Sequence, residues 1–268
     1  MRNIDFWEGE AYGFEEKYNK DNNKDLPRLD SFLVEDGKKH SCMLILPGGG
    51  FDHLADHEGE NIAEELNKAG ISAFVLYYRV APYTYPLNFL DAKRAFVHIK
   101  ENAEKYHIDK LGVMGFSAGA FLSLALTEKY DMTFNTGNGS LDNTGYRPDV
   151  LGLCYPVISF EDESIWHKGS CENFFGAEKA TKENRLSFSG ELNVRDDMPP
   201  TFLWSTFEDK SVNCHNALFM ASALKKKNIP FELHIFPDGR HGIDLATNVE
   251  GTNQWFDLYV NWLKRQGF

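Results

Sequence analysis

Residues 111–126 read LGVMGFSAGAFLSLAL, and this stretch decides the fold that the rest of the chain has to complete. It opens with an apolar run, closes with helical spacing, and carries the pattern Gly-x-Ser-x-Gly around Ser117 between the two. A sharp turn between a strand and a helix lifts a serine hydroxyl clear of the backbone, and the flanking glycines remove side chains that would clash there. Five residues of this pattern can arise by chance, but the strand before and the helix after favour Ser117 as a nucleophile.

Apolar runs and amphipathic segments alternate on both sides of this stretch. Strands are expected over residues 41–46, 71–78, 111–116, 150–155, 201–205 and 231–236, and helices over residues 57–69, 87–106, 213–227 and 250–264 as well as directly after Ser117. This alternation predicts an α/β fold with a mostly parallel central sheet and helices on both faces. Ligands of such sheets bind at the carboxyl ends of the strands.

The domain organisation follows from composition along the chain. Residues 1–40 are polar and predict an N-terminal arm, extended, with one edge hairpin ending at the turn over residues 35–38. No Pro/Gly/Ser-rich linker divides residues 41–268, which are expected to form a single catalytic domain. Residues 156–198 read as irregular, with one or two short helices.

The net charge, the first residues and the cysteines limit the partners and the location that we expect for this protein. Acidic residues outnumber basic ones 40 to 28, giving a net charge of −12, which argues against nucleic acid and membrane surfaces as partners. The first residues are acidic where a signal peptide would be apolar, so a cytoplasmic location is expected. The four cysteines lie far apart and show no metal-ligand spacing, which favours buried free thiols. Self-association into a homo-oligomer stays open.

A nucleophilic serine needs a base, and the base needs an orienting carboxylate. His241 lies in a glycine-flanked loop after an expected strand, and it is preferred as the base over the rivals His215 and His234. Asp209 follows the strand over residues 201–205 and completes the chain order Ser, Asp, His that is typical of α/β-hydrolases. The adjacent Glu208 remains an alternative acid, and capping of the next helix remains an alternative role for Asp209.

Backbone donors for an oxyanion are expected at two places. Ala118 follows the nucleophile, while Gly49 and Gly50 lie in the sequence Pro-Gly-Gly-Gly directly after the strand over residues 41–46. The same glycines could form a plain tight turn. The phosphate-binding pattern Gly-Lys-Ser/Thr and the dinucleotide pattern Gly-x-Gly-x-x-Gly are missing from the sequence, and we expect neither an organic cofactor nor a metal.

Several motifs together carry a family resemblance. They are PGGGF at residues 47–51, HEGE at 57–60, LYYRV at 76–80, GVMGFSAG at 112–119, RPD at 147–149, YPVIS at 155–159, PPTFL at 199–203 and HIFP at 234–237. From about residue 40 onward the chain resembles the α/β-hydrolase serine esterases of the acetyl-xylan esterase and feruloyl-esterase-like (BD-FAE-like) group. The resemblance implies carboxylesterase chemistry on acetylated carbohydrates, as in xylan degradation, with Ser117, Asp209 and His241 at the triad positions. Asn213 departs from the group, where proline is common.

The resemblance leads us to expect a small-molecule ester, an acetylated sugar above all, as substrate. Two other classes stay open: an exopeptidase of the prolyl-oligopeptidase kind, which would carry a large N-terminal domain, and a non-catalytic ligand-binding hydrolase homologue, which would lose a triad member. Residues 131–147 and 156–198 offer little apolar surface for a lid over a long acyl chain. Their aromatic residues, Phe160, Trp166, Phe174, Phe175 and Phe188, read equally as pocket walls or as core.

Overall fold

The computed structural model describes residues 1–15, 26–137 and 145–268. Within these residues the strands are β1 (Arg28–Phe32), β2 (His40–Leu46), β3 (Ser72–Tyr77), β4 (Ile108–Phe116), β5 (Leu151–Cys154), β6 (Thr201–Thr206) and β7 (Phe231–Phe236). The helices are α1 (Glu60–Lys68), α2 (Leu87–Glu101), α3 (Ala118–Glu128), α5 (Lys168–Phe175), α6 (Lys182–Phe188), α7 (His215–Lys226) and α8 (Trp255–Arg265), with short 3-10 turns at η1 (Asp56–Glu58), η2 (Ala177–Lys179), η3 (Gly190–Leu192) and η4 (Thr252–Gln254). Parts of the predicted arm and of the predicted loop over residues 131–147 lie outside the described residues.

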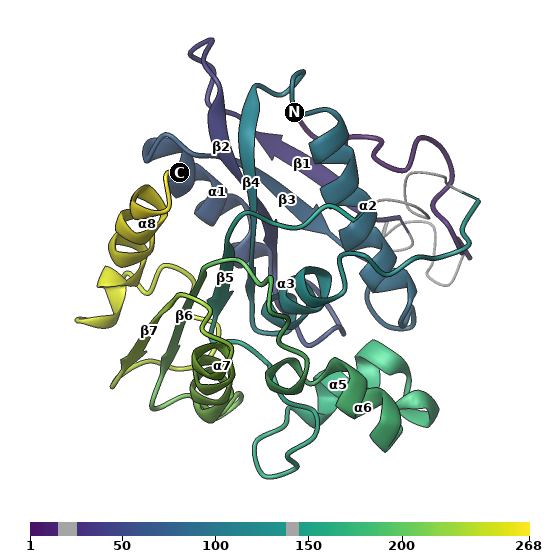
Figure 1. Cartoon of the computed structure of the whole chain (residues 1–268), viewed down its shortest axis with the longest axis vertical. Coiled ribbons are helices and arrows are strands. Elements are labelled where there is room, and N and C mark those ends of the chain that lie inside the picture. Colours follow the sequence, from purple (N-terminus) through teal and green to yellow (C-terminus); the bar gives the residue numbers. More distant parts are fainter. Residues whose placement is uncertain (16–25, 138–144) are drawn as a thin grey trace.

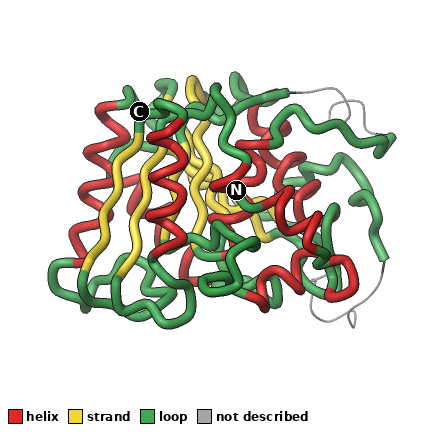
Figure 2. The backbone as a smooth tube through the Cα atoms, turned by 60° about the horizontal axis from the view of Figure 1, so that its bottom comes forward, coloured by secondary structure: helices red, strands yellow, loops and turns green. Residues whose placement is uncertain are grey.

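The strands form one sheet in the order β1-β3-β2-β4-β5-β6-β7. All neighbouring pairs from β3 to β7 are parallel, and only β1 runs antiparallel, against β3. Helices cover both faces, with α1 and α8 on one side and α2, α3 and α7 on the other (Figures 1 and 2). The predicted fold class, a mostly parallel sheet between two helical layers, is confirmed.

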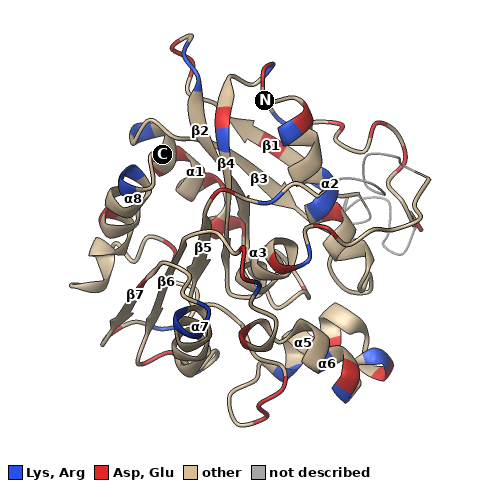
Figure 3. Cartoon of the chain, viewed as in Figure 1, with Lys and Arg blue, Asp and Glu red and all other residues tan. Residues whose placement is uncertain are grey.

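Burial explains why the strands read as continuous apolar runs. A sheet covered on both faces has no solvent face, so alternation between polar and apolar positions is lost. The helix α3 is buried along its whole length, which matches its apolar or small residues up to Leu126; Glu128 at its end is a buried acid. Lys, Arg, Asp and Glu gather on the helices and loops, while most of the central strands carry other residues (Figure 3).

The N-terminal segment is more closely integrated than the predicted arm. Strand β1 pairs along β3, and Ile4 forms a further bridge to Leu29. The indole of Trp7 donates to Asp91 at 3.2 Å, within a buried ion pair between Asp91 and Arg79. The turn over residues 35–38 does not close a hairpin with β2, because β3 lies between β1 and β2 in the sheet. Side chains before residue 41 therefore contribute to the core.

Parallel strands bring distant residues to one edge of the sheet. The loops after β2, β4, β6 and β7 begin at the carboxyl ends of these strands, and they carry Gly49, Ser117, Asp209 and His241 respectively. Among the helices in the described ranges, none combines the length and the apolar character needed to cross a bilayer.

Candidate active site

Ser117 occupies the strained turn that the sequence predicts between β4 and α3. Its backbone has φ 54° and ψ −117°, a conformation that a non-glycine residue adopts only where the surroundings enforce it. A Cβ on Gly119 would lie 2.1 Å from the Leu46 carbonyl oxygen, and one on Gly115 would lie 2.2 Å from the Gly119 carbonyl oxygen. Both glycines of the motif are therefore required by close backbone packing around the serine.

A continuous chain of hydrogen bonds starts at the Ser117 hydroxyl. The Oγ atom lies 2.7 Å from His241 Nε2, and His241 Nδ1 lies 2.6 Å from Asp209 Oδ2. The other oxygen of Asp209 accepts the N–H groups of Ser211 and Val212, both at 2.9 Å. Because the carboxylate accepts from Nδ1–H, Nε2 is left as the acceptor that faces the serine hydroxyl. The structure thus brings together the three residues that the sequence predicts.

The rival residues are engaged elsewhere. Glu208 is exposed, and its carboxylate contacts only the Gly239 N–H at 3.4 Å within the described residues. His215 is exposed and bonds to Asn213, while His234 pairs with Glu232 on β7. Asp209 and His241 are therefore the acid and the base that the geometry favours. The helix-capping alternative for Asp209 holds only for its second oxygen, which orders the turn before α7.

The glycine loop, residues 47–50, lies against the serine. The Gly48 N–H donates to Glu58 Oε2 at 2.7 Å, so this donor is turned away from any substrate. Gly49 and Gly50 have φ 117° and 65°, and within the described residues their N–H groups donate no hydrogen bond. Ala118 is the first residue of α3, where a backbone N–H has no intrahelical acceptor. These three N–H groups are the free donors next to Ser117 that an oxyanion hole requires.

Two side chains of the site were not identified from the sequence. Glu58 and Tyr155 both fall within the motifs that carry the family resemblance, yet no spacing rule assigns them a role. The Glu58 carboxylate is buried and accepts the Tyr155 hydroxyl at 2.7 Å in addition to the Gly48 N–H. Burial raises the pKa of Glu58, and the hydrogen bond from Tyr155 opposes that rise. Glu58 lies in the polar stretch DHLADHEGE at residues 52–60, so nothing in the local sequence distinguishes it as a buried acid.

The serine opens into a cavity of about 380 Å³. Its described lining is made mostly of glycine and polar side chains from α5 and from the segments after β2, β4, β6 and β7: Gly49, Gly50, Asp52, His53, Ala55, His57, Glu58, Ser117, His167, Gly169, Asn173, Ser211, Arg240, His241 and Gly242. Phe160, Phe174, Phe175 and Phe188, which the sequence left between pocket wall and core, are buried in the core instead. Trp166 is partly buried and packs under Arg185.

His167 is the largest side chain on the α5 side of this cavity. Its Nδ1 accepts the Ser170 N–H at 3.1 Å as the cap of α5, so a neutral ring carries its proton on Nε2. Burial lowers the pKa of His167, and the nearby His241 adds to this effect, which favours that neutral form. The site therefore has a further hydrogen-bond donor, from the α5 side of the cavity.

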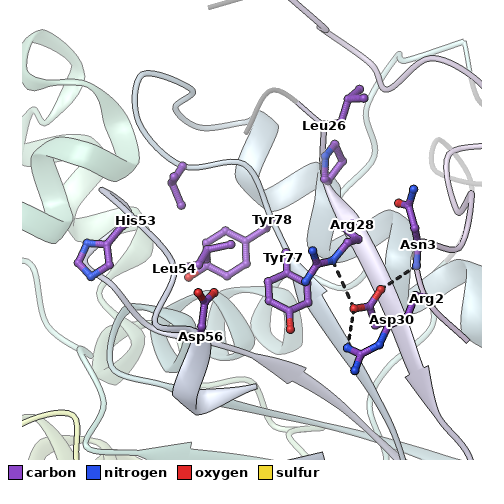
Figure 4. A pocket seen from close by; sticks show the side chains of 12 residues that line it. Arg2, Asn3, Leu26, Arg28, Asp30, His53, Leu54, Asp56, Tyr77 and Tyr78 are labelled. Carbon is purple, nitrogen blue, oxygen red and sulfur yellow. Dashed lines mark hydrogen bonds and ion pairs between the residues drawn. The ribbon is translucent and has the colours of Figure 1, made fainter. Parts of the chain in front are cut away.

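A second cavity, of about 930 Å³ (Figure 4), has His53 in common with the lining of the first. Three of its polar groups converge on one carboxylate: Arg2, Arg28 and the Asn3 N–H all point at the buried Asp30, at 3.1, 3.3 and 2.7 Å. None of Ser117, Asp209 and His241 lines it. The smaller cavity is therefore the candidate active site, because it contains the reactive groups.

Metal-binding groups were sought in the same structure. Within residues 1–15, 26–137 and 145–268, no three His, Cys, Asp or Glu side chains are grouped so that they could hold a metal ion. The four cysteines are free and buried.

The fold and the hydrogen-bonded serine at a strand–helix turn define the class of α/β-hydrolases. The family model described as BD-FAE matches residues 29–224, and the chain belongs to this family. The resemblance to the BD-FAE-like group, seen first in the sequence motifs, is thereby confirmed.

Individual relatives agree with this assignment. The chain is 38% identical to endo-1,4-beta-xylanase B of Butyrivibrio fibrisolvens, in a match that covers 93% of this chain and 39% of that protein. It is 32% identical to an acetylxylan esterase of Xylanibacter ruminicola, in a match that covers 87% of this chain and 47% of that protein. It thus spans less than half the length of these relatives. The crystal structure of an acetyl ester-xyloside bifunctional hydrolase from Caldicellulosiruptor lactoaceticus superposes with a TM-score of 0.91 and 38% identity, covering 99% of this chain and 96% of that one.

Proposed function

We propose that this chain is a serine carboxylesterase that removes acetyl or other short acyl groups from carbohydrates or small alcohols through an acyl-enzyme intermediate. The observation that carries the proposal is the hydrogen-bond chain Ser117–His241–Asp209 beside the free N–H groups of Gly49, Gly50 and Ala118. A non-catalytic homologue would be expected to have lost part of this arrangement. The names of the relatives, an acetylxylan esterase and an acetyl ester-xyloside hydrolase, support an ester rather than a peptide as substrate.

In the proposed reaction, His241 first accepts a proton and then returns it. Ser117 Oγ attacks the ester carbonyl carbon while His241 Nε2 takes the hydroxyl proton, and Asp209 stabilises the resulting imidazolium. The carbonyl oxygen becomes an oxyanion that the backbone donors receive. The carbon–oxygen bond to the alcohol then breaks, and His241 returns the proton to the leaving alkoxide. Water repeats the sequence on the acyl-enzyme and releases the carboxylic acid.

The cavity lining supports a short acyl group. Each methylene of a longer chain would need apolar contact, worth about 0.8 kcal/mol when fully buried. Among the described residues that line the cavity, Ala55 is the only one with an aliphatic side chain. Donors and acceptors such as His167 and Asn173 suit the hydroxyl groups of a sugar on the alcohol side. The cytoplasmic location, the absence of a cofactor and the oligomeric state stay predictions.

Covalent labelling tests the serine assignment. We expect a fluorophosphonate to modify Ser117 alone, with the adduct mapped by mass spectrometry, and Ser117→Ala to fold normally but to be inactive. Labelling at another residue of an active preparation would refute the assignment. On nitrophenyl esters, kcat/KM should be highest for acetate and fall through butyrate to octanoate. Faster turnover of octanoate than of acetate would favour a lipid esterase instead.

A further inference from the structure

The carboxylate of Glu58 is buried between two walls of the candidate active site. The residue is 2% exposed and lies in η1, directly behind the glycine loop. One carboxylate oxygen accepts the Gly48 N–H and the other accepts the Tyr155 hydroxyl, both at 2.7 Å. The proposed reaction assigns this group no role.

On the first wall, Glu58 holds the beginning of the glycine loop. A Cβ built on Gly48 would lie 2.7 Å from Glu58 Oε2 and 3.0 Å from Ser117 Cβ, so the Gly48 backbone is confined between the carboxylate and the nucleophile. The next two residues, Gly49 and Gly50, carry the free N–H groups. Holding the Gly48 backbone in place therefore also restrains the position, relative to Ser117, of the two N–H groups that follow it in the chain.

On the second wall, Glu58 holds the ring that supports His241. The Tyr155 ring centroid lies 5.1 Å from that of His241, at an interplanar angle of 70°. The Tyr155 hydroxyl also accepts the Asp244 N–H at 3.3 Å, from the loop that follows His241. Tyr155 itself comes directly after β5, so its contacts join β5 to the histidine loop after β7, across the end of β6.

We propose that Glu58 is a positioning residue that joins the glycine loop to Tyr155. It thereby holds the oxyanion donors and His241 at fixed positions around Ser117. The inference rests on the proposed function, since it concerns the geometry of that reaction. Two short hydrogen bonds accepted by one buried carboxylate are well suited to this task, because a charged acceptor makes stronger and shorter bonds than a neutral one.

Variants of the two bonded side chains separate this role from general stability. Glu58→Gln keeps the size of the side chain and one oxygen acceptor but removes the charge, and Tyr155→Phe keeps the ring against His241 but removes the hydroxyl. The matched control is Glu128→Gln, because Glu128 is also a buried glutamate but lies at the far end of α3 from Ser117. For each variant, kcat and KM on nitrophenyl acetate, the rate of fluorophosphonate labelling and the thermal melting curve are measured.

We expect Glu58→Gln to lower kcat by roughly 10- to 100-fold with KM changed less than about threefold, because a small displacement of reacting groups costs on this order. Labelling should slow in parallel. Tyr155→Phe should show a smaller loss of the same kind, and the double variant should lose no more than Glu58→Gln alone, because both changes break one connection. Glu128→Gln should leave kcat unchanged.

The outcomes are distinguishable. Wild-type kcat in a folded Glu58→Gln variant, or equal losses in Glu58→Gln and Glu128→Gln, would overturn the positioning role. If Glu58→Gln does not fold, Tyr155→Phe with unchanged kcat and labelling overturns it. A wild-type chain that is labelled at Ser117 but hydrolyses no ester refutes the proposed function, while slower labelling of the Glu58 variant still supports the positioning role. A wild-type chain that is neither labelled nor active overturns both.

Discussion

Asp209→Asn should invert the proton arrangement of His241. In the wild-type structure Asp209 Oδ1 accepts two N–H groups, from Ser211 and Val212, each at 2.9 Å. Only an oxygen can accept them, so the amide oxygen of the asparagine has to occupy this position. Its NH₂ group then takes the place of Oδ2, 2.6 Å from His241 Nδ1, and donates to the ring. The imidazole proton moves to Nε2, which can no longer accept from the Ser117 hydroxyl.

The size of the effect follows from this wrong tautomer. The same exchange in a Ser-His-Asp protease lowers kcat by about 10⁴-fold, which corresponds to about 5.4 kcal/mol at 1.36 kcal/mol per factor of ten. KM should change little, because Asp209 lies behind the imidazole and does not line the cavity. The fold should persist, since the side chain keeps its shape and all three of its hydrogen-bonded contacts, with only the one to His241 reversed in direction.

Steady-state hydrolysis of nitrophenyl acetate measures the loss, with circular dichroism as the folding control. The matched variant is the neighbouring Glu208→Gln, whose exposed side chain makes a single 3.4 Å contact that an amide oxygen can keep. We expect this variant to stay within about twofold of wild type, since exposed polar contacts contribute little. A loss below tenfold in Asp209→Asn, or a larger loss in Glu208→Gln, would refute the assignment of the acid.

Three further predictions concern the turn around Ser117, the buried carboxyl group of Glu128 and metal ions. Gly119→Ala should cost about 1–3 kcal/mol in denaturant unfolding and most of the activity, because its methyl group would lie 2.1 Å from the Leu46 carbonyl oxygen; an unchanged midpoint and rate would contradict this. Burial raises the pKa of Glu128 well above its ordinary 4.5, with Lys129 opposing the rise, so the folded state holds a proton that the unfolded state has lost. The free energy of unfolding should therefore fall as pH rises from 4.5 toward the folded-state pKa, and Glu128→Gln should flatten that slope. A chelator should leave ester hydrolysis unchanged, because the triad and backbone donors supply acyl transfer without a metal; a loss that a divalent ion restores would contradict this.

The sequence predicted the parts of the site that obey local rules. Gly-x-Ser-x-Gly between an apolar run and a helix is a local pattern, because the close approach of Gly115 and Gly119 to neighbouring backbone demands it. The parallel sheet then brings the loops after β4, β6 and β7 to one edge, so chain order and position after a strand indicated Asp209 and His241, with Glu208 left as an alternative acid. The structure adds their contact, and their roles in the reaction stay predictions.

Parts of the fold that depend on long-range contacts were not predictable in this way. The polar composition of residues 1–40 indicated an arm, but β1 pairs with β3 and Trp7 reaches Asp91, 84 positions along the chain. The role of Glu58 is hidden for the same reason, since its two donors lie 10 residues before it and 97 residues after it. No periodicity or spacing rule predicts a hydrogen bond between residues so far apart in the sequence.

The aromatic residues after β5 explain why no Phe, Trp, Leu, Ile or Val side chain is among the described residues that line the cavity. The ring centroid of Phe160 lies 4.4 Å from that of Phe121 on α3, and the ring centroid of Phe174 lies 5.0 Å from that of Phe51, the residue that follows the glycine loop. These rings pack into the core beneath the cavity and leave its lining to histidine, asparagine and glycine. The large aromatic side chains of residues 156–198 are therefore buried in the core, and few apolar side chains of this segment are left to cover a long acyl chain. The same packing that anchors the glycine loop thus favours a short acyl group on the serine.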